Sequence, residues 1–443
     1  MRTTVLFFIF SFLWISSFAQ QSFTLKEAQE YGVKNNLQIK LKQLDIADAD
    51  GQITETKAIG MPKVSAGVDY QYFPQLPQFL LPAQFFNPGA PEGEFTAIDA
   101  GTRQTLVGNI QANAVAFDGS YLVALKAVKL YKELVRKEIN QTEFEIRNGV
   151  TKSYLAVLIA IQGRELIDLN ITNLRKVLAE TKIIYENGFL EKLDVDRLTF
   201  SLENLLAEQR KSTELINLSY NLLKFQMGYP LDQDIAVAGD LEEMVNVALL
   251  EKVEVTAEVD YTQRPEYAVI QLGQELNKIN IRRWKAGYLP SLYAFVNHQQ
   301  ALNRNNLFDN DETAWLPTTV VGLNLNIPIY DGGDKKGKIQ RAKIAYDKTE
   351  IQKKQFEQAM TLEISNAYLN YANAKETLES TKRSLDLAQR IYDTTQIKYK
   401  EGVGASLEVT QAESDLYGAQ GRYVSALYDL VVAKTNIDMA LGK

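Results

Sequence analysis

The chain has 443 residues, 46% hydrophobic and 23% charged, with no cysteine and a single histidine, His298. Disulfides, thiolate metal sites and cysteine nucleophiles are therefore excluded, and so is a cluster of histidine ligands. The 48 basic and 55 acidic side chains give a net charge of −7, which argues against a nucleic-acid-binding protein with a basic face. The composition points away from catalysis, metals and cofactors, and toward architecture.

Residues 1–19 are typical of an export signal peptide. Arg2 precedes an apolar run from Val5 to Ile15, and Ser17-Phe18-Ala19 offers the small residues that signal peptidase requires. The run is shorter than the roughly 20 residues of a bilayer-spanning helix. We therefore expect cleavage after Ala19. No later stretch reaches 18 apolar residues, so the exported chain is periplasmic, secreted, or held in a membrane by β-strands.

Two pairs of segments alternate between apolar and polar residues, at about 63–73 with 105–117 and at about 291–300 with 318–330. Such repeats of about ten residues suit tilted transmembrane strands with lipid on one side and water on the other. A soluble antiparallel sheet gives the same alternation. We place His298 on such a strand as an interior or interfacial side chain.

Each strand pair encloses a long connection. Pro74 to Gln104 contains five prolines, and Gln300 to Pro317 is rich in asparagine and aspartate. We expect both to be irregular loops on one side of a membrane.

Residues 118–229 and 329–443 contain no proline, so long helices can form there. Helices over about 119–186 and 334–399 would each extend about 100 Å. The last helix has apolar residues at alternating steps of four and three, as a coiled coil does. This series comprises Ala405, Val409, Ala412, Leu416, Ala419, Tyr423, Ala426, Leu430, Ala433, Ile437 and Ala440.

The chain is internally duplicated. Tyr185-Glu-Asn-Gly188 aligns with Tyr399-Lys-Glu-Gly402 at an offset of 214, and the same offset aligns Met227-Gly228 with Leu441-Gly442. We predict a first repeat over 20–229, an equatorial linker over 230–262 and a second repeat over 263–443. Four strands cannot close a barrel, and an open sheet edge is not tolerated in lipid, so the strands predict oligomerisation.

The export signal, the duplicated helix–hairpin–helix unit and the Tyr-x-x-Gly turns resemble the TolC-like outer membrane efflux proteins. The resemblance extends from Thr24-Leu25-Lys26-Glu27-Ala28 to Ala440-Leu441-Gly442. It implies a mainly α fold with β: a homotrimer in which four strands per chain form a 12-stranded transmembrane β-barrel, continuous with a long periplasmic α-helical barrel. It also implies a passive, non-enzymatic exit duct in the outer membrane, extending into the periplasm. Its partners would be outer membrane lipid, a periplasmic adaptor protein and an inner-membrane transporter for efflux or type I secretion.

The resemblance also assigns roles to the helix turns at 185–194 and 399–408, which we call the first and second tips. Threefold repetition would gather Asp194 and Glu408, with Tyr185 and Tyr399, into an acidic periplasmic gate. Both acids could instead only stabilise helix N-termini. The adaptor contacts implied at the tips are Gly188, Gly402, Val403, Gly404 and Ala405.

The sequence departs from the family at two gate positions. Well-studied members carry an arginine near Gly404 and an aspartate near Gln411, so their gate network does not transfer to this chain. Two other classes stay open. A periplasmic or surface coiled-coil protein would leave the strands unexplained, and an exported hydrolase would need an acid/base pair such as Asp194 with Glu408.

Overall fold

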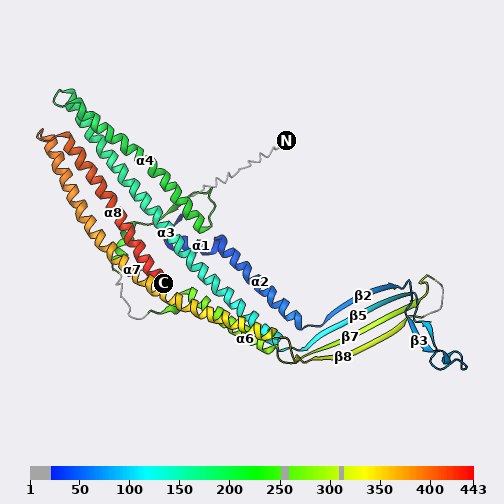
Figure 1. The fold of residues 1–443 in the computed structure, drawn as a ribbon. Coiled ribbons are helices and arrows are strands. Elements are labelled where there is room, and N and C mark those ends of the chain that lie inside the picture. Colours follow the sequence, from blue (N-terminus) through cyan, green and yellow to red (C-terminus); the bar gives the residue numbers. More distant parts are fainter. Residues whose placement is uncertain (1–20, 251–258, 309–313) are drawn as a thin grey trace, which may run out of the picture. The chain divides into compact units, whose positions relative to one another are not determined.

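The computed structural model describes residues 21–250, 259–308 and 314–443, so the expected signal peptide lies outside the described residues. Figure 1 shows its helices and strands. The chain divides into two compact units. The first comprises residues up to Leu44, Lys137–Val269 and Lys353–Lys443, and the second comprises Asp45–Arg136 and Ile270–Gln352.

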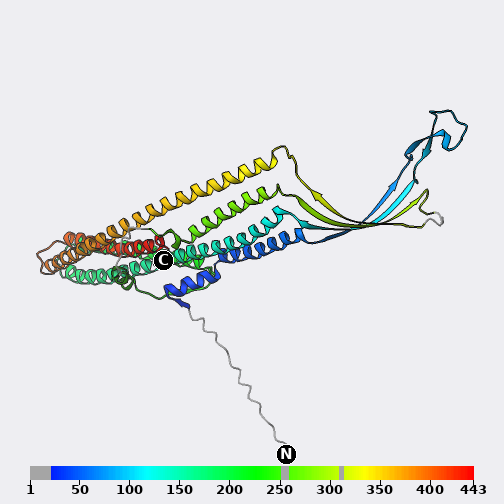
Figure 2. The same cartoon turned by 90° about the horizontal axis from the view of Figure 1, so that it is seen from below.

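The second unit contains a four-stranded antiparallel sheet in the order β2-β5-β7-β8. The strands are β2 (Lys63–Tyr72), β5 (Gln104–Phe117), β7 (Ser291–Arg304) and β8 (Leu316–Asn326). They lie side by side in both views of the ribbon (Figures 1 and 2). Within the described ranges β2 and β8 each pair with one neighbour, so both are edge strands.

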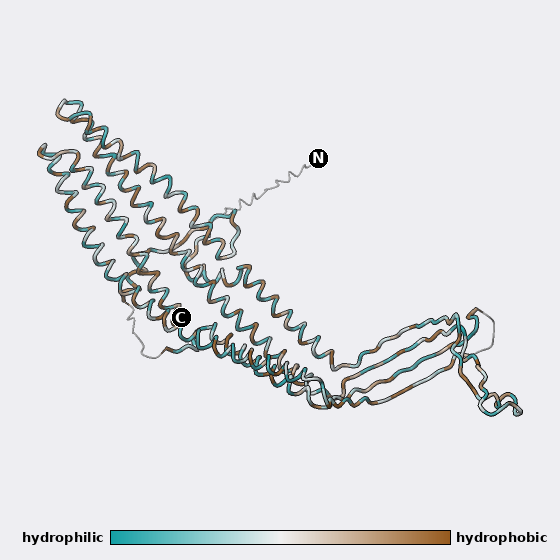
Figure 3. Tube along the Cα trace, viewed as in Figure 1, coloured by the Kyte–Doolittle hydropathy of each residue, from teal (hydrophilic) through white to brown (hydrophobic). Residues whose placement is uncertain are grey.

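The register gives this sheet an apolar and a polar face. One row across the four strands is apolar, and the row beside it on the opposite face is polar in three of its four members. The apolar row is Val64, Ala112, Val296 and Val321; the second is Ser65, Gln111, Asn297 and Val320. Figure 3 shows hydrophobic and hydrophilic residues mixed along each strand. The alternation in sequence is therefore an alternation between faces.

His298 belongs to the apolar face. It lies in register with Ile110 and Thr319, and Ile110 pairs with Ala66 on the other side. Its Nδ1 lies 2.8 Å from the Thr319 hydroxyl oxygen, a hydrogen bond between adjacent strands. A hydrogen-bonded neighbour lowers the cost of placing a polar ring on this face.

The prediction of an irregular loop from Pro74 to Gln104 is wrong, because the segment contains a second sheet. Strands β3 (Gln78–Pro82) and β4 (Phe95–Asp99) form a two-stranded antiparallel hairpin with the short 3-10 helix η1 (Ala83–Phe85) between them. Both prolines at its ends are compatible with pairing, since Pro77 supplies only its carbonyl to Ala100 and Pro82 ends its strand. The second connection is shorter than expected, since β7 continues to Arg304 and β8 starts at Leu316.

Two long helices run through both units. Helix α3 (Gly119–Glu186) has 68 residues and α7 (Asp334–Lys400) has 67, about 100 Å each. An aspartate precedes the first residue of each helix: Asp118 directly precedes α3, and Asp331 lies three residues before α7. The Asp118 carboxylate accepts from the Tyr121 amide, and that of Asp331 from the Gly333 and Lys335 amides. These aspartates satisfy amides that a helix start leaves unpaired.

Two returning helices complete the hairpins of the first unit. Helix α4 (Lys192–Met227) follows α3, and α8 (Ser406–Ala440) follows α7. Nine of the eleven apolar positions predicted along α8 are buried, the exceptions being Ala405, which precedes the helix, and the half-buried Tyr423. In α4, two of the buried positions that align with apolar positions of α8 are polar. Ser212 and Ser219 stand where α8 has Ala426 and Ala433.

Short elements join the two hairpins of the first unit. They are β1 (Gln21–Phe23), α1 (Leu25–Asn35), β6 (Ile235–Val237) and α5 (Leu241–Leu250), with η2 (Tyr261–Gln263). Strand β1 pairs in parallel with β6, and α5 contacts α8. The fully buried Tyr154 hydroxyl lies 3.0 Å from the Phe23 carbonyl oxygen and 2.6 Å from that of Ala238. Burial raises the pKa of Tyr154 to about 12, so it stays a donor.

The remaining helices are α2 (Leu37–Gly60) and α6 (Pro265–Ala286). None of the helices in the described ranges is both long and apolar enough to cross a membrane.

Candidate functional site

Both predicted tips are built by the same helix-ending motif. Gly188 and Gly402 have φ values of +81° and +75°, in the left-handed region that favours glycine. The Gly188 amide donates to the Tyr185 carbonyl, and the next amide, that of Phe189, reaches back to the Ile184 carbonyl.

The second tip repeats this pattern. The Gly402 amide donates to the Tyr399 carbonyl and the Val403 amide to that of Lys398. The Tyr-x-x-Gly repeat therefore encodes a helix end, and the duplication persists at the level of single hydrogen bonds.

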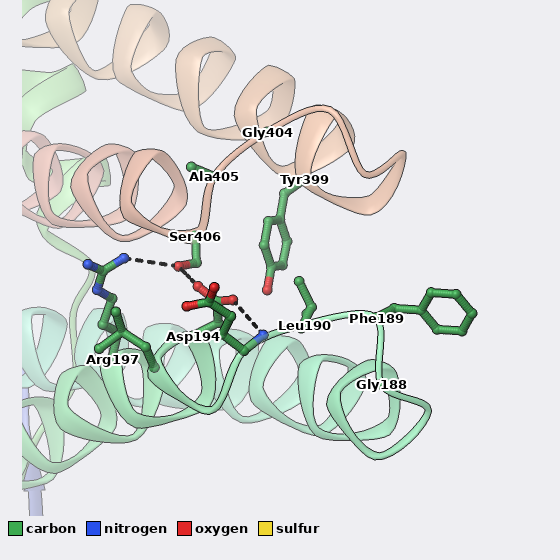
Figure 4. A pocket seen from close by; sticks show the side chains of 11 residues that line it. Gly188, Phe189, Leu190, Asp194, Arg197, Tyr399, Gly404, Ala405 and Ser406 are labelled. Carbon is green, nitrogen blue, oxygen red and sulfur yellow. Dashed lines mark hydrogen bonds between the residues drawn. The ribbon is translucent and has the colours of Figure 1, made fainter.

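A pocket of about 410 Å³ lies between the two tips. Figure 4 shows its residues: Gly188, Phe189, Leu190, Glu191, Leu193, Asp194 and Arg197 from the first tip and α4, and Tyr399, Gly404, Ala405 and Ser406 from the second. Five of the nine predicted site residues line it, and Tyr185, Gly402, Val403 and Glu408 do not. Sequence reasoning missed Phe189, Arg197 and Ser406.

Asp194 connects the two tips. Its carboxylate closes a capping box with Glu191 at the start of α4, with the Glu191 amide donating to Oδ2 at 3.3 Å. The buried Ser406 hydroxyl donates to the other carboxylate oxygen, Oδ1. Arg197 Nη1 in turn donates to the Ser406 oxygen at 3.4 Å. These dashed contacts in Figure 4 run from α4 to the first residue of α8.

Glu408 has a different environment, although it is the sequence equivalent of Asp194. It is exposed in the first turn of α8, where a carboxylate is favoured by the helix dipole. The residue equivalent to Ser406 at the offset of 214 is Lys192, which explains why the serine contact has no counterpart.

The two tyrosines also differ. Tyr185 is 39% exposed, whereas Tyr399 is buried and packs with Tyr392, Val409 and Ala412. The Tyr399 hydroxyl is buried without a hydrogen-bond partner among the described residues. Burial raises the pKa of Tyr399, so its ring stays neutral at physiological pH.

Gly404 lies against backbone. A Cβ added there would be 3.0 Å from the Tyr399 amide nitrogen and 3.2 Å from the Lys398 carbonyl carbon. The arginine that related proteins carry near this position would therefore require the turn to shift.

Apolar side chains project beyond the tips. Phe189 is 82% and Val403 78% exposed, and the two are equivalent at the offset of 214. A cavity of this size, flanked by exposed apolar side chains, is suited to receive a protein segment.

A buried acid lies deeper in the same helices. Glu413 of α8 is 2% exposed, and the Tyr417 hydroxyl donates to its Oε1 at 2.6 Å. Gln420 lies seven residues after Glu413 on α8, and its side-chain oxygen accepts a hydrogen bond from Asn170 Nδ2 of α3 at 2.9 Å. Burial raises the pKa of Glu413, because a buried carboxylate loses hydration.

This burial predicts a pH-dependent stability. Below about pH 4.5 the carboxyl is protonated in both the folded and unfolded states. As the pH rises, the unfolded state ionises first, so stability falls until the raised pKa of the folded state is passed. Glu413→Gln should remove this fall and raise the Tm by a few degrees at pH 7, with little gain at pH 4. Thermal melts by circular dichroism at both values measure it.

The exposed Glu379 of α7 supplies the matched control. Glu379→Gln should leave the Tm unchanged at both pH values. Equal stabilisation by both substitutions would contradict a role for burial of Glu413.

The known proteins that this chain resembles form one class, the outer membrane efflux proteins. Residues 262–443 match the family model for outer membrane efflux proteins. The chain is 23% identical over 294 residues to the outer membrane protein TolC of Vibrio cholerae, covering 66% of each protein. It is 20% identical over 302 residues to the alkaline protease secretion protein AprF of Pseudomonas aeruginosa, covering 67% of this chain and 61% of that protein.

Two solved structures have the same fold. The CusC channel superimposes with a TM-score of 0.75 at 16% identity, covering 94% of this chain and 92% of CusC. VceC of Vibrio cholerae gives 0.69 at 15% identity, covering 94% and 96%. Residues 262–443 are thus similar in sequence to the outer membrane efflux proteins, and the predicted mainly α fold with β-strands is confirmed. The location of the chain is the outer membrane, with an extension into the periplasm.

Proposed function

We propose that the chain forms a passive exit duct for efflux or type I secretion, as a homotrimer whose 12 strands close one barrel. The observation that carries the proposal is the two-faced sheet with two edge strands. Its apolar face is exposed in the single chain, with Val68 75% and Val321 73% exposed. Lipid would cover this face, and neighbouring copies would pair with the edges.

The matched relatives support a duct for more than one kind of cargo. One is named for alkaline protease secretion and another, from Pseudomonas putida, for antibiotic efflux. Proteins of this family are channels, so no catalytic role is proposed. The energy would come from an inner-membrane transporter. We propose that its periplasmic adaptor meets the tips at Gly188, Gly402, Val403, Gly404 and Ala405, and also at Phe189.

We further propose that the repeats 20–229 and 263–443 pack as pseudo-equivalent halves joined by the linker 230–262. In the trimer, Asp194 and Glu408 would contribute six carboxylates near the periplasmic entrance, with Tyr185 and Tyr399 beside them. Carboxylate rings favour cations. The hydrogen bond from Ser406 to Asp194 supports a gate in which the two tips are held together.

Planar bilayer recordings test the duct and its acidic ring together. The purified protein should form trimers that conduct, with a cation-selective reversal potential in a KCl gradient. Asp194→Asn with Glu408→Gln should lower that reversal potential to roughly half or less, because six carboxylates are removed from the entrance.

A matched control is Glu376→Gln with Asp386→Asn, which removes the same charge from exposed positions of α7. Its reversal potential should stay at the starting value. A protein that makes no pores would contradict the duct and favour a coiled-coil structural protein. Pores with unchanged selectivity in the double variant would contradict only the acidic ring.

A further inference from the structure

A cluster of cations lies where α6 ends and α7 begins, within the second unit. We call it the basic joint. It consists of Arg282, Arg283, Lys285, Lys335, Lys336 and Lys338, with the aromatic residues Trp284 and Tyr288.

The aromatic rings hold the two helix ends together. Lys338 Nζ lies 5.0 Å from the centre of the Trp284 ring, and Lys335 Nζ lies 5.5 Å from that of Tyr288. Arg283 is placed over the Trp284 ring at 5.2 Å. These are cation–π contacts, so the cations of α7 and the aromatic residues around the end of α6 form one surface.

The joint has more positive charge than its own carboxylates neutralise. Lys335 pairs with Asp331 at 3.2 Å and Lys338 with Asp334 at 2.7 Å. Six cations therefore face two carboxylates, an excess of four positive charges in a chain whose net charge is −7. The exposed Arg282, Lys285 and Lys336 have no ion-pair partner in the described part of the chain.

Helix stability does not account for this charge. The cations at the end of α6 are favoured by the helix dipole, but those in the first turn of α7 oppose it. Asp334 is the acidic residue of that turn, and it is already paired with Lys338. An external anion would offset the unfavourable charge of the α7 N-terminus.

The position of the joint indicates which anion. Helix α6 ends at Ala286, five residues before β7 begins at Ser291, and β8 ends at Asn326, eight residues before α7. The joint thus lies at the periplasmic end of the strands that we propose to cross the membrane. Tryptophan, tyrosine, lysine and arginine concentrate at the level of lipid headgroups.

We propose that the basic joint binds the phosphate headgroups of anionic phospholipids in the periplasmic leaflet of the outer membrane. The inference rests on the proposed duct, since it requires β7 and β8 to span that membrane. The cation–π contacts fix Lys335 and Lys338, and the exposed Arg282, Lys285 and Lys336 contact the phosphates.

Trp284 serves as the reporter. The chain has three tryptophans, of which Trp14 falls in the expected signal peptide. A Trp315→Phe background therefore leaves Trp284 as the single tryptophan of the mature protein. The purified trimer is placed in phosphatidylcholine vesicles containing brominated phosphatidylglycerol or, separately, brominated phosphatidylcholine. Quenching of Trp284 fluorescence then gives the relative affinity for the anionic lipid.

We expect a preference of about threefold or more for phosphatidylglycerol. Arg282→Gln, Lys285→Gln and Lys336→Gln together should reduce it to about one. The control of Lys375→Gln, Lys382→Gln and Arg383→Gln removes the same three charges from exposed positions further along α7 and should keep the preference.

Three results would overturn the inference: no preference in the starting protein, equal loss in the control, or loss on adding inorganic phosphate at constant ionic strength. The last would identify a site for free anions. Bilayer recordings on the same preparations separate this failure from failure of the duct. Normal pores without a lipid preference would contradict only the proposed lipid site. Absence of both pores and trimers would contradict the proposed duct as well.

Discussion

Val321→Arg is expected to reduce the amount of assembled trimer in the outer membrane at least tenfold. Val321 is at the middle of β8 and is 73% exposed on the apolar face of the sheet. An arginine on the lipid face near the bilayer midplane costs about 2–4 kcal/mol, and a trimer carries three. Semi-native gels of outer membrane fractions measure the assembled species.

The neighbouring residue provides the control, because adjacent strand positions face opposite ways. Val320 lies in the row of Ser65, Gln111 and Asn297. Val320→Arg should therefore face the watery interior of the proposed barrel and leave assembly nearly unchanged. Equal losses of assembled trimer from the two substitutions would contradict a membrane-facing sheet. If only Val321→Arg is tolerated, the face that carries Val320 would be the one toward lipid.

The strands and helix ends could be read from sequence because each depends on local physics. Alternation from Val64 to Val68 has the period of a strand, and the register then places the apolar residues of four strands on one face. Glycine at Gly188 and Gly402 supplies the left-handed conformation that ends a helix. A repeated motif therefore predicted a repeated geometry.

The hairpin of β3 and β4 was missed because its sequence carries conflicting signals. Its strands are five residues each, and Pro77 and Pro82 flank or end the first of them. Proline normally argues against a strand, yet it is permitted at a strand end where no amide is needed.

The contacts within the candidate site could not be predicted, because they join residues far apart in the chain. Ser406 donates to Asp194 across 212 residues, and the duplication treats Asp194 and Glu408 as equals. A signal was nevertheless available: the same offset aligns Ser406 with Lys192, so the two acids face different partners. Phe189 could have been found as the equivalent of Val403.

The second large effect is expected at Gly228, where Gly228→Ala should lower the free energy of unfolding by about 3 kcal/mol. Gly228 ends α4 with φ +68°, which costs an alanine about 1–2 kcal/mol. An added Cβ would also lie 2.7 Å from Asn36 Cα and 2.8 Å from the Asn35 carbonyl oxygen. These are backbone atoms, so relief requires moving α1 or α4, at a further cost of about 1–3 kcal/mol. Denaturant unfolding of the purified protein measures the loss.

Two other glycines separate these causes. Gly188 has φ +81° but open space around an added Cβ, so Gly188→Ala should cost only about 1 kcal/mol. Gly163 lies inside α3 and also has open space around an added Cβ. Gly163→Ala should therefore raise the free energy of unfolding by roughly 0.5–1 kcal/mol. Gly442, the repeat equivalent of Gly228, has φ +75° and a Cβ position 2.6 Å from the Gln263 carbonyl oxygen. Gly442→Ala should thus lower the free energy of unfolding by as much as Gly228→Ala, because in both repeats the helix-ending glycine packs against backbone atoms. A loss no larger than that of Gly188→Ala would contradict this close packing.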